Sequence, residues 1–245
     1  MKSRPASPSP QVLARIGGAF YLMTILLGLF GQVAIRGKII VAGDAAATAA
    51  NLKVMESLWR LGIACEVAVG ICTIVLTWAL YLLLRPVNKD LALLATIFSL
   101  IASAVETAFS LQLFQALYPL GNAAYLRSFT ADQLSAMTSL AVRAHSSGFG
   151  LALLMFGCFF PIAAYLIFKS SYFPKAVGIL YLIPGLSYLI SSFALILAPS
   201  FADRYYFVIV APALIGELSL TLWLLLRGVN VEKWEEMVSA ARGSV

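Results

Sequence analysis

Six long runs of uncharged, apolar residues constrain the fold of this chain more strongly than any other feature. An α-helix needs roughly 20 apolar residues to cross a bilayer core about 30 Å thick, and each run is close to that length. Charged or turn-forming residues bound the runs, which cover about residues 16–35, 61–84, 91–117, 146–168, 176–198 and 207–226. The pattern predicts an all-α, polytopic bundle of six transmembrane helices.

The composition excludes an ordinary soluble enzyme. Hydrophobic residues make up 61% of the 245 residues and charged residues only 11%, whereas soluble domains carry about 25% charged residues. The formal net charge of +6 comes without a cluster of basic and aromatic residues, so we expect no nucleic-acid partner. We expect one transmembrane domain over 15–227 whose partner is the lipid bilayer, a disordered cytoplasmic tail over 1–14, and a second cytoplasmic tail over 228–245.

The distribution of cations predicts the orientation in the membrane. Six spans place both termini on one side, and if that side is the cytoplasm it carries ten of the 17 Lys and Arg residues on the shorter loops. An aromatic residue near the headgroups, followed one turn later by a cation, anchors a helix end. Spans two, four and six all end in this way, at Tyr81 and Arg85, Tyr165 and Lys169, and Trp223 and Arg227. We therefore predict that both termini are cytoplasmic.

Both long outer loops contain signals for the start of a helix. Asp44 precedes an Ala-rich stretch, and Asp is a favoured N-cap residue. Thr130 and Gln133 have the spacing of a capping box. We expect short amphipathic helices in both loops, the second placed to continue into the fourth span, and a short interfacial helix over 230–241 with Trp234 on it.

Glutamate and glutamine residues inside the predicted spans are the first candidates for a site, because ionisable groups are costly in a bilayer. We counted about 1.5 Å of depth per residue from the cytoplasmic end of each span. Glu217 then lies about 15 Å deep, Glu106 and Gln32 about 24 to 25 Å, and Glu66 about 28 Å. The set predicts a pocket that opens outward, with Glu217 at its floor and Glu106 and Glu66 along its wall.

Three further candidates lie near the outer headgroups. The same count places His145, Arg60 and Arg143 at about 36 to 39 Å, and His145 would complete the wall of the pocket. A carboxyl group in lipid is a hydrogen-bond donor when neutral and requires a cation when charged. Two interpretations stay open: a structural ion pair of Glu66 with Arg60 or Arg143, and a ligand or proton site that uses Glu106, Glu217 and His145.

The sequence assigns no catalytic residue, metal or cofactor. One His and the absence of His-x-x-x-His or Glu-x-x-His spacing argue against a metal site. Ser187 and His145 could be proposed as a nucleophile and base, but the surrounding pattern is too short to be specific. A role without catalysis is therefore favoured over an enzyme.

Five segments occur in an order that resembles one family. They are Arg-Ile-Gly-Gly-Ala-Phe-Tyr-Leu at 15–22, Gly-Asp-Ala-Ala-Ala-Thr-Ala-Ala-Asn at 43–51, Trp-Arg-Leu-Gly-Ile-Ala at 59–64, His145 before Gly148-Phe-Gly150, and Ala-Leu-Ile-Gly-Glu-Leu-Ser-Leu-Thr-Leu-Trp at 213–223. Together they resemble the bacterial domain of unknown function 4386 family (DUF4386) from Arg15 to Arg227. The resemblance implies a six-span protein of the bacterial inner membrane and no activity. The family's recurring polar positions match Arg60, Glu106, His145 and Glu217.

Three functional hypotheses follow. The favoured one is a membrane protein whose polar pocket binds or transports a small or amphipathic molecule. An alternative is an enzyme that acts on a lipid or isoprenoid at the outer leaflet, with Glu106 and His145 as acid and base. The other is a non-catalytic accessory or assembly protein with a packed interior. The identity of the ligand and the oligomeric state are not determined by the sequence.

Overall fold

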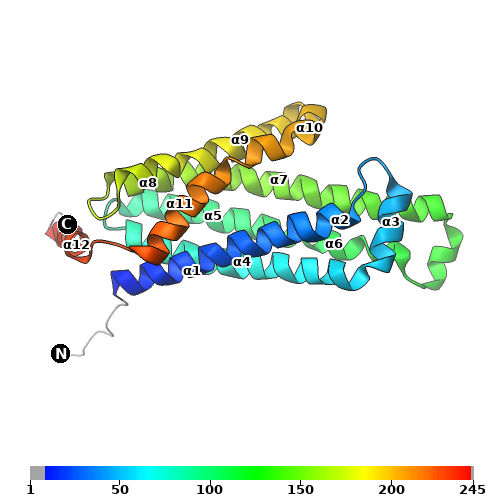
Figure 1. Cartoon of the computed structure of the whole chain (residues 1–245), viewed down its shortest axis with the longest axis horizontal. Coiled ribbons are helices and arrows are strands. Elements are labelled where there is room, and N and C mark those ends of the chain that lie inside the picture. The colour runs from blue at the N-terminus through cyan, green and yellow to red at the C-terminus, as the bar shows by residue number, and fades with distance from the viewer. Residues whose placement is uncertain (1–8, 244–245) are drawn as a thin grey trace. The chain divides into compact units, whose positions relative to one another are not determined.

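The structure, a computed structural model, describes residues 9–243, and every regular element in this part of the chain is a helix (Figure 1). Six of its helical segments are long and apolar enough to cross a membrane, as the sequence predicts. They cover Pro10–Ile39, Glu56–Leu84, Lys89–Leu120, Ala131–Lys169, Lys175–Leu197 and Pro199–Leu226. Large hydrophobic side chains are exposed along these segments, as expected for helices that face lipid.

The contacts divide the chain into two compact units. Within the described residues, unit 1 comprises 9–22, 73–101 and 153–243, and unit 2 comprises 23–72 and 102–152. The boundary falls inside four helices, so both units are built from helix portions far apart in the sequence. The helices that contribute to both units are α1 (Pro10–Leu29), α4 (Glu56–Leu84), α5 (Lys89–Phe109) and α7 (Ala131–Lys169).

The first two predicted boundaries need correction. The predicted disordered tail ends at residue 14, but α1 begins at Pro10, where proline is favoured in a first helical turn. The rest of that predicted tail, residues 1–8, lies outside the described residues. The first helix also continues beyond the predicted span, through a π-helix over Phe30–Arg36 (η1) into α2 (Gly37–Ile39).

Unit 1 contains two broken helices whose interruptions follow from proline chemistry. The fifth span consists of α8 (Lys175–Leu180) and α9 (Leu182–Leu197), and Pro184 has no N–H to donate to the Leu180 carbonyl. Gly216 of the sixth span lies against this break, where a side chain would meet the Leu180 oxygen. The sixth span is likewise divided at Pro212, into α10 (Pro199–Val210) and α11 (Ala213–Leu226). The predicted sixth span begins at residue 207 and therefore leaves out most of α10.

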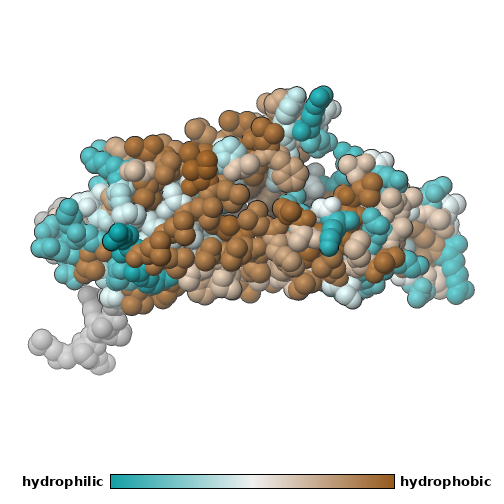
Figure 2. Space-filling view, viewed as in Figure 1, coloured by the Kyte–Doolittle hydropathy of each residue, from teal (hydrophilic) through white to brown (hydrophobic). Residues whose placement is uncertain are grey.

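The C-terminal segment of unit 1 forms the predicted helix, α12 (Val231–Gly243), with Asn230 as its cap. Trp234 donates from its indole N–H to the Leu83 carbonyl of α4 at 3.2 Å. The Tyr172 hydroxyl, from the loop between α7 and α8, donates to the same oxygen at 2.7 Å. In Figure 2, brown apolar residues predominate along α9 and α11, whereas α12 is largely teal.

The loop helices of unit 2 confirm both predicted caps. The Asp44 carboxylate accepts from the Ala47 N–H at 2.8 Å, and α3 (Ala45–Val54) follows. Thr130 and Gln133 form a reciprocal capping box, and α7 runs without interruption from Ala131 through the fourth predicted span. The other loop contains α6 (Leu111–Gln115) and two 3₁₀ turns, η2 (Tyr118–Leu120) and η3 (Ala124–Ser128).

A hydrophobic core organises unit 2 beside these loops. Trp59 of α4 is 2% exposed, and its indole N–H donates to the Leu113 carbonyl of α6 at 2.9 Å. Thr138 of α7 donates to the Ala116 carbonyl at 3.2 Å. Around these bonds pack Ile35, Ile39, Leu52, Ile63, Ala141 and Val142. Side chains from two long helices therefore hold α6 and the residue that follows it.

Candidate functional site

Five polar side chains of unit 2 gather inside the apolar helices. We call them the Glu66 cluster: Gln32 and Arg36 from η1, Glu66 from α4, Glu106 from α5 and His145 from α7. Glu66, Glu106 and His145 are 6%, 7% and 4% exposed, and Arg36 is 9% exposed. Four elements thus bring together two carboxyl groups, a guanidinium and an imidazole that are buried and an amide that is half-buried.

Arg36 forms the central ion pair of this cluster. Its guanidinium donates to Glu66 Oε1, and both side chains are buried. The Arg36 Nε–H also donates to Gln32 Oε1 at 2.8 Å. Buried charges are tolerated when they are paired and hydrogen-bonded, and Arg36 has both kinds of partner.

The π-helix η1 supplies the backbone for this arrangement. Within it, Gln32 and Arg36 carry the hydrogen-bonded side chains, and the Gly37 N–H bonds to the Gln32 carbonyl five residues earlier. A π-helical turn holds one more residue than an α-helical turn, and such turns are frequent at functional sites. The π-helix therefore contains both the buried cation, Arg36, and its hydrogen-bond partner, Gln32.

His145 and the second Glu66 oxygen face each other without a hydrogen bond. His145 Nε2 lies 3.9 Å from Glu66 Oε2, which is beyond hydrogen-bonding distance. Both atoms are buried, and neither finds a hydrogen-bond partner among the described residues. The His145 ring stacks on Phe149, with ring centroids 6.5 Å apart. Glu66 Oε2 and His145 Nε2 can therefore each form a further hydrogen bond beside the ion pair.

Glu106 adds a second carboxyl group to the cluster. It lies within electrostatic range of both Glu66 and Arg36. Within residues 9–243, no hydrogen bond to its carboxyl oxygens is found, and no group of His, Cys, Asp and Glu side chains is arranged to hold a metal ion. The cluster therefore contains two carboxyl groups and one guanidinium.

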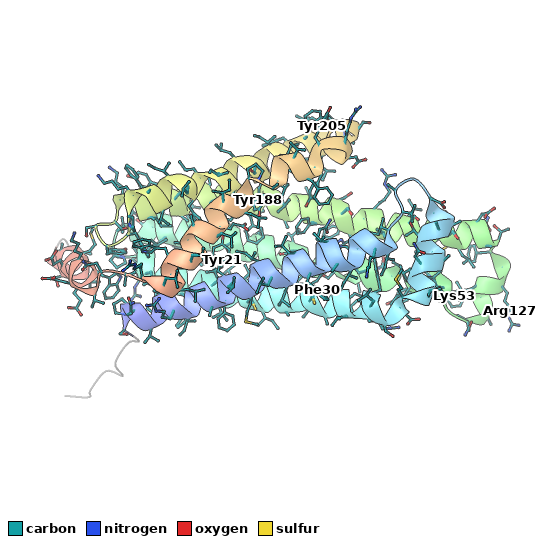
Figure 3. The ribbon with its side chains drawn as sticks, viewed as in Figure 1. Tyr21, Phe30, Lys53, Arg127, Tyr188 and Tyr205 are labelled. Atoms are coloured by element: carbon teal, nitrogen blue, oxygen red, sulfur yellow. The ribbon has the colours of Figure 1, made fainter. Side chains whose placement is uncertain are left out.

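Glu217 belongs to unit 1 and has an aromatic environment. The Tyr188 hydroxyl of α9 donates to Glu217 Oε1 at 2.7 Å. Tyr21 and Tyr181 lie within electrostatic range of the same carboxyl group, and their hydroxyls are 3.3 Å apart. Figure 3 shows Tyr21 on α1 and Tyr188 on α9. Across residues 9–243 no Lys, Arg or His side chain lies within ion-pair distance of Glu217.

Arg60 and Arg143, the two cations named in the ion-pair interpretation of Glu66, lie elsewhere. Arg60 is exposed and forms an ion pair with Glu56, one turn earlier on α4, at 2.8 Å. Arg143 is exposed on α7. Of the two open interpretations, the ion pair of Glu66 does form, but its cation is Arg36 and neither Arg60 nor Arg143. The depth estimate could have identified Arg36. It lies 21 residues after Arg15, which places it about 31 Å deep, close to the depth of Glu66.

The structure places six of the seven candidate residues in unit 2 and Glu217 in unit 1. Gln32, Glu66, Glu106 and His145 come together in the Glu66 cluster, whereas Arg60 and Arg143 do not join it. The shared outward-opening pocket with Glu217 as its floor stays a prediction. Arg36 as a site residue and Tyr188 as the partner of Glu217 are not among the residues predicted from the sequence.

Comparison with known proteins gives a family match and one curated relative. A family model described as "Domain of unknown function (DUF4386)" matches residues 16–228, which include every candidate residue. An uncharacterized protein of Archaeoglobus fulgidus is 28% identical over 162 residues, which cover 66% of this chain and 78% of that protein. No solved structure matches the chain.

Proposed function

Because the chain belongs to the DUF4386 family, whose description assigns no activity, we propose a function from the geometry of the site. The protein binds or transports a small or amphipathic molecule, and the Glu66 cluster is the place where that molecule is bound. The observation that carries this proposal is the pair of buried atoms, Glu66 Oε2 and His145 Nε2, that face each other at 3.9 Å without hydrogen bonds.

A purely structural ion pair does not account for this arrangement. Buried polar groups in folded proteins are nearly all hydrogen-bonded, and each exception calls for a reason. The Arg36 and Glu66 charges already neutralise each other. Glu106 and His145 add two buried ionisable groups that this pair does not need. Polar groups kept inside a membrane at such cost are functional candidates.

The charges of the cluster favour a cationic ligand. The cluster holds two carboxyl groups and one guanidinium, so one negative charge is left without a guanidinium when both carboxyl groups are ionised. A proton or a positively charged molecule supplies the missing charge, and a donor group on the ligand satisfies Glu66 Oε2. Binding of a cation and binding of a proton then exclude each other, as in proton-coupled exchange.

We place the protein in the cytoplasmic membrane with both termini in the cytoplasm. The excess of Lys and Arg on the loops of that side and the three matching helix ends support this orientation. A fluorescent protein that folds only in the cytoplasm, fused after Val245, is expected to fluoresce in cells. An alkaline phosphatase fused there, active only outside the cytoplasm, is expected to be inactive. The opposite pattern would reverse the orientation.

Two hydrophobic ions of equal size and opposite charge test the binding proposal. We expect the purified full-length protein to bind radiolabelled tetraphenylphosphonium saturably and more weakly as the pH falls, and not to bind tetraphenylborate. Glu106→Gln is expected to weaken cation binding at least about tenfold, which corresponds to roughly 1.4 kcal/mol. Arg143→Gln, an exposed change on α7, is the matched control and is expected to bind like the wild type.

Several outcomes would contradict the proposal. They are the absence of saturable cation binding, equal binding of both ions, and unchanged binding by Glu106→Gln. Elution volume and melting temperature establish that each variant is folded, and Glu106→Asp, which keeps the carboxyl group, is expected to retain part of the binding. Glu217→Gln in the same assay tests the carboxyl group of unit 1 separately.

A further inference from the structure

A pocket of about 300 Å³ lies in unit 2 at the start of α4, and none of the Glu66 cluster lines it. This volume is at the small end of the range for small-molecule sites, about 300 to 1,000 Å³. Its chemically distinctive lining residues are Glu56, Arg60, Phe114, Tyr118, Asn122 and Tyr125. One ion pair, one amide and three aromatic rings thus surround a single hollow.

The ion pair leaves binding capacity on both partners. Arg60 Nε donates to Glu56 Oε1 at 2.8 Å, and Arg60 Nη2 lies 2.8 Å from the same oxygen. Among the described residues, Arg60 Nη1 and Glu56 Oε2 have no further partner. A guanidinium has five N–H donors and a carboxylate about four lone-pair sites, so each partner can bind a ligand while the pair stays formed.

Three aromatic rings, from α6 and the two 3₁₀ turns that follow it, line the other side of the pocket. Tyr118 and Tyr125 are 58% and 67% exposed, and Phe114 is 38% exposed. The faces of such rings attract ammonium groups, and tyrosine is enriched where the membrane meets water. A positive group is therefore favoured near the rings and Glu56, and a negative group near Arg60.

The pocket is built on a rigid base. On α4, Glu56 and Arg60 lie one turn apart on one face, while Trp59 faces the core and anchors α6 by its bond to the Leu113 carbonyl. The Thr138 bond to the Ala116 carbonyl holds the segment that follows α6. The α4 and α6 parts of the lining are therefore held together before a ligand arrives, which lowers the entropy cost of binding.

We propose that this pocket binds a zwitterion that carries a phosphate and an ammonium group, with the phosphate on Arg60 and the ammonium on Glu56 and the tyrosine rings. Two sources share this chemistry: the headgroup of an ethanolamine phospholipid and the free phosphoethanolamine group of a soluble compound. The phosphate takes the charge-assisted hydrogen bonds that guanidinium favours.

The melting temperature of the full-length protein in detergent micelles tests this proposal, because a ligand stabilises the folded state that binds it. Glycerophosphoethanolamine represents the soluble source and lysophosphatidylethanolamine the lipid source. Glycerol phosphate and lysophosphatidylglycerol are the controls without an ammonium group. At least one zwitterion is expected to raise the melting temperature of the wild type more than its control does, and the arm that responds identifies the source.

Variants then place the effect in the pocket. Arg60→Gln and Glu56→Gln are expected to fold, because both side chains are about half exposed, and to lose the shift. Arg143→Gln, which removes an exposed Arg outside the pocket, is expected to keep it. The proposal is overturned if neither zwitterion raises the melting temperature, if the anionic controls raise it equally, or if the shift persists in Arg60→Gln.

Discussion

Arg36 and Glu66 form a buried ion pair between residues 30 positions apart in the sequence. Both side chains are about nine-tenths buried, one on the π-helix η1 and one in the middle of α4. Arg36 lies at the end of the first predicted span, a position typical of a cation in a loop. The pair shows instead that this end of the first helix belongs to the interior of unit 2.

Removal of Arg36 is expected to destabilise the protein strongly. Arg36→Met leaves the Glu66 carboxylate buried without its cation, and breaking a buried pair in this way costs about 3 to 5 kcal/mol. The double variant with Glu66→Leu is expected to recover much of that loss, because no unpaired charge remains. Urea or heat unfolding in detergent, arranged as a double-mutant cycle, measures both effects.

Arg60→Met provides the matched control for this experiment. It breaks an ion pair that is about half exposed, and such pairs contribute about 0 to 1 kcal/mol. Equal losses for Arg36→Met and Arg60→Met would show that the Arg36 pair contributes no more than a surface pair.

The indole hydrogen bond of Trp59 is expected to stabilise unit 2. Trp59→Phe keeps the ring in the core but leaves the Leu113 carbonyl without its donor, at a cost of about 1 to 3 kcal/mol. Trp78→Phe is the control on the same helix, because Trp78 is 45% exposed and such changes alter stability by about 0.5 kcal/mol or less. Thermal unfolding of the two variants compares them, and a larger loss in Trp78→Phe would contradict the role of Trp59.

Tyr172 predicts a dependence on alkaline pH. Burial raises the pKa of its hydroxyl above the ordinary value of 10.0, so the folded protein keeps the proton that donates to the Leu83 carbonyl. Above that ordinary value the unfolded chain releases its proton while the folded chain does not. The contribution of Tyr172 to stability is therefore complete below about pH 10 and falls as the pH rises further.

Tyr172→Phe isolates this effect. The variant is expected to be less stable than the wild type by about 1 kcal/mol near neutral pH, since Trp234 still donates to the same carbonyl. The difference is expected to shrink between about pH 9 and about pH 11. Unfolding curves of both proteins across this range measure it, and a difference that grows with pH would refute the assignment.

Features that depend on local chemistry were predictable. The six spans follow from apolar runs of sufficient length, and the Asp44 cap and the Thr130 capping box follow from residues three apart. The proline-initiated α10 was missed because polar residues inside it resemble a loop. Its sequence contains Asp203 and Arg204, which interrupt the apolar run before the sixth span.

The sequence by itself determined that this chain forms six membrane-length helices with acidic residues inside them, because the transfer of apolar residues into a bilayer and the capping of helix ends are local properties. Only the tertiary structure decided which cation neutralises Glu66. Arg36, Arg60 and Arg143 lie at similar depths, and depth says nothing about the direction in which each side chain faces. The rotation of each helix about its axis, set by packing and by the π-helix η1, turns Arg36 inward and leaves the other two exposed.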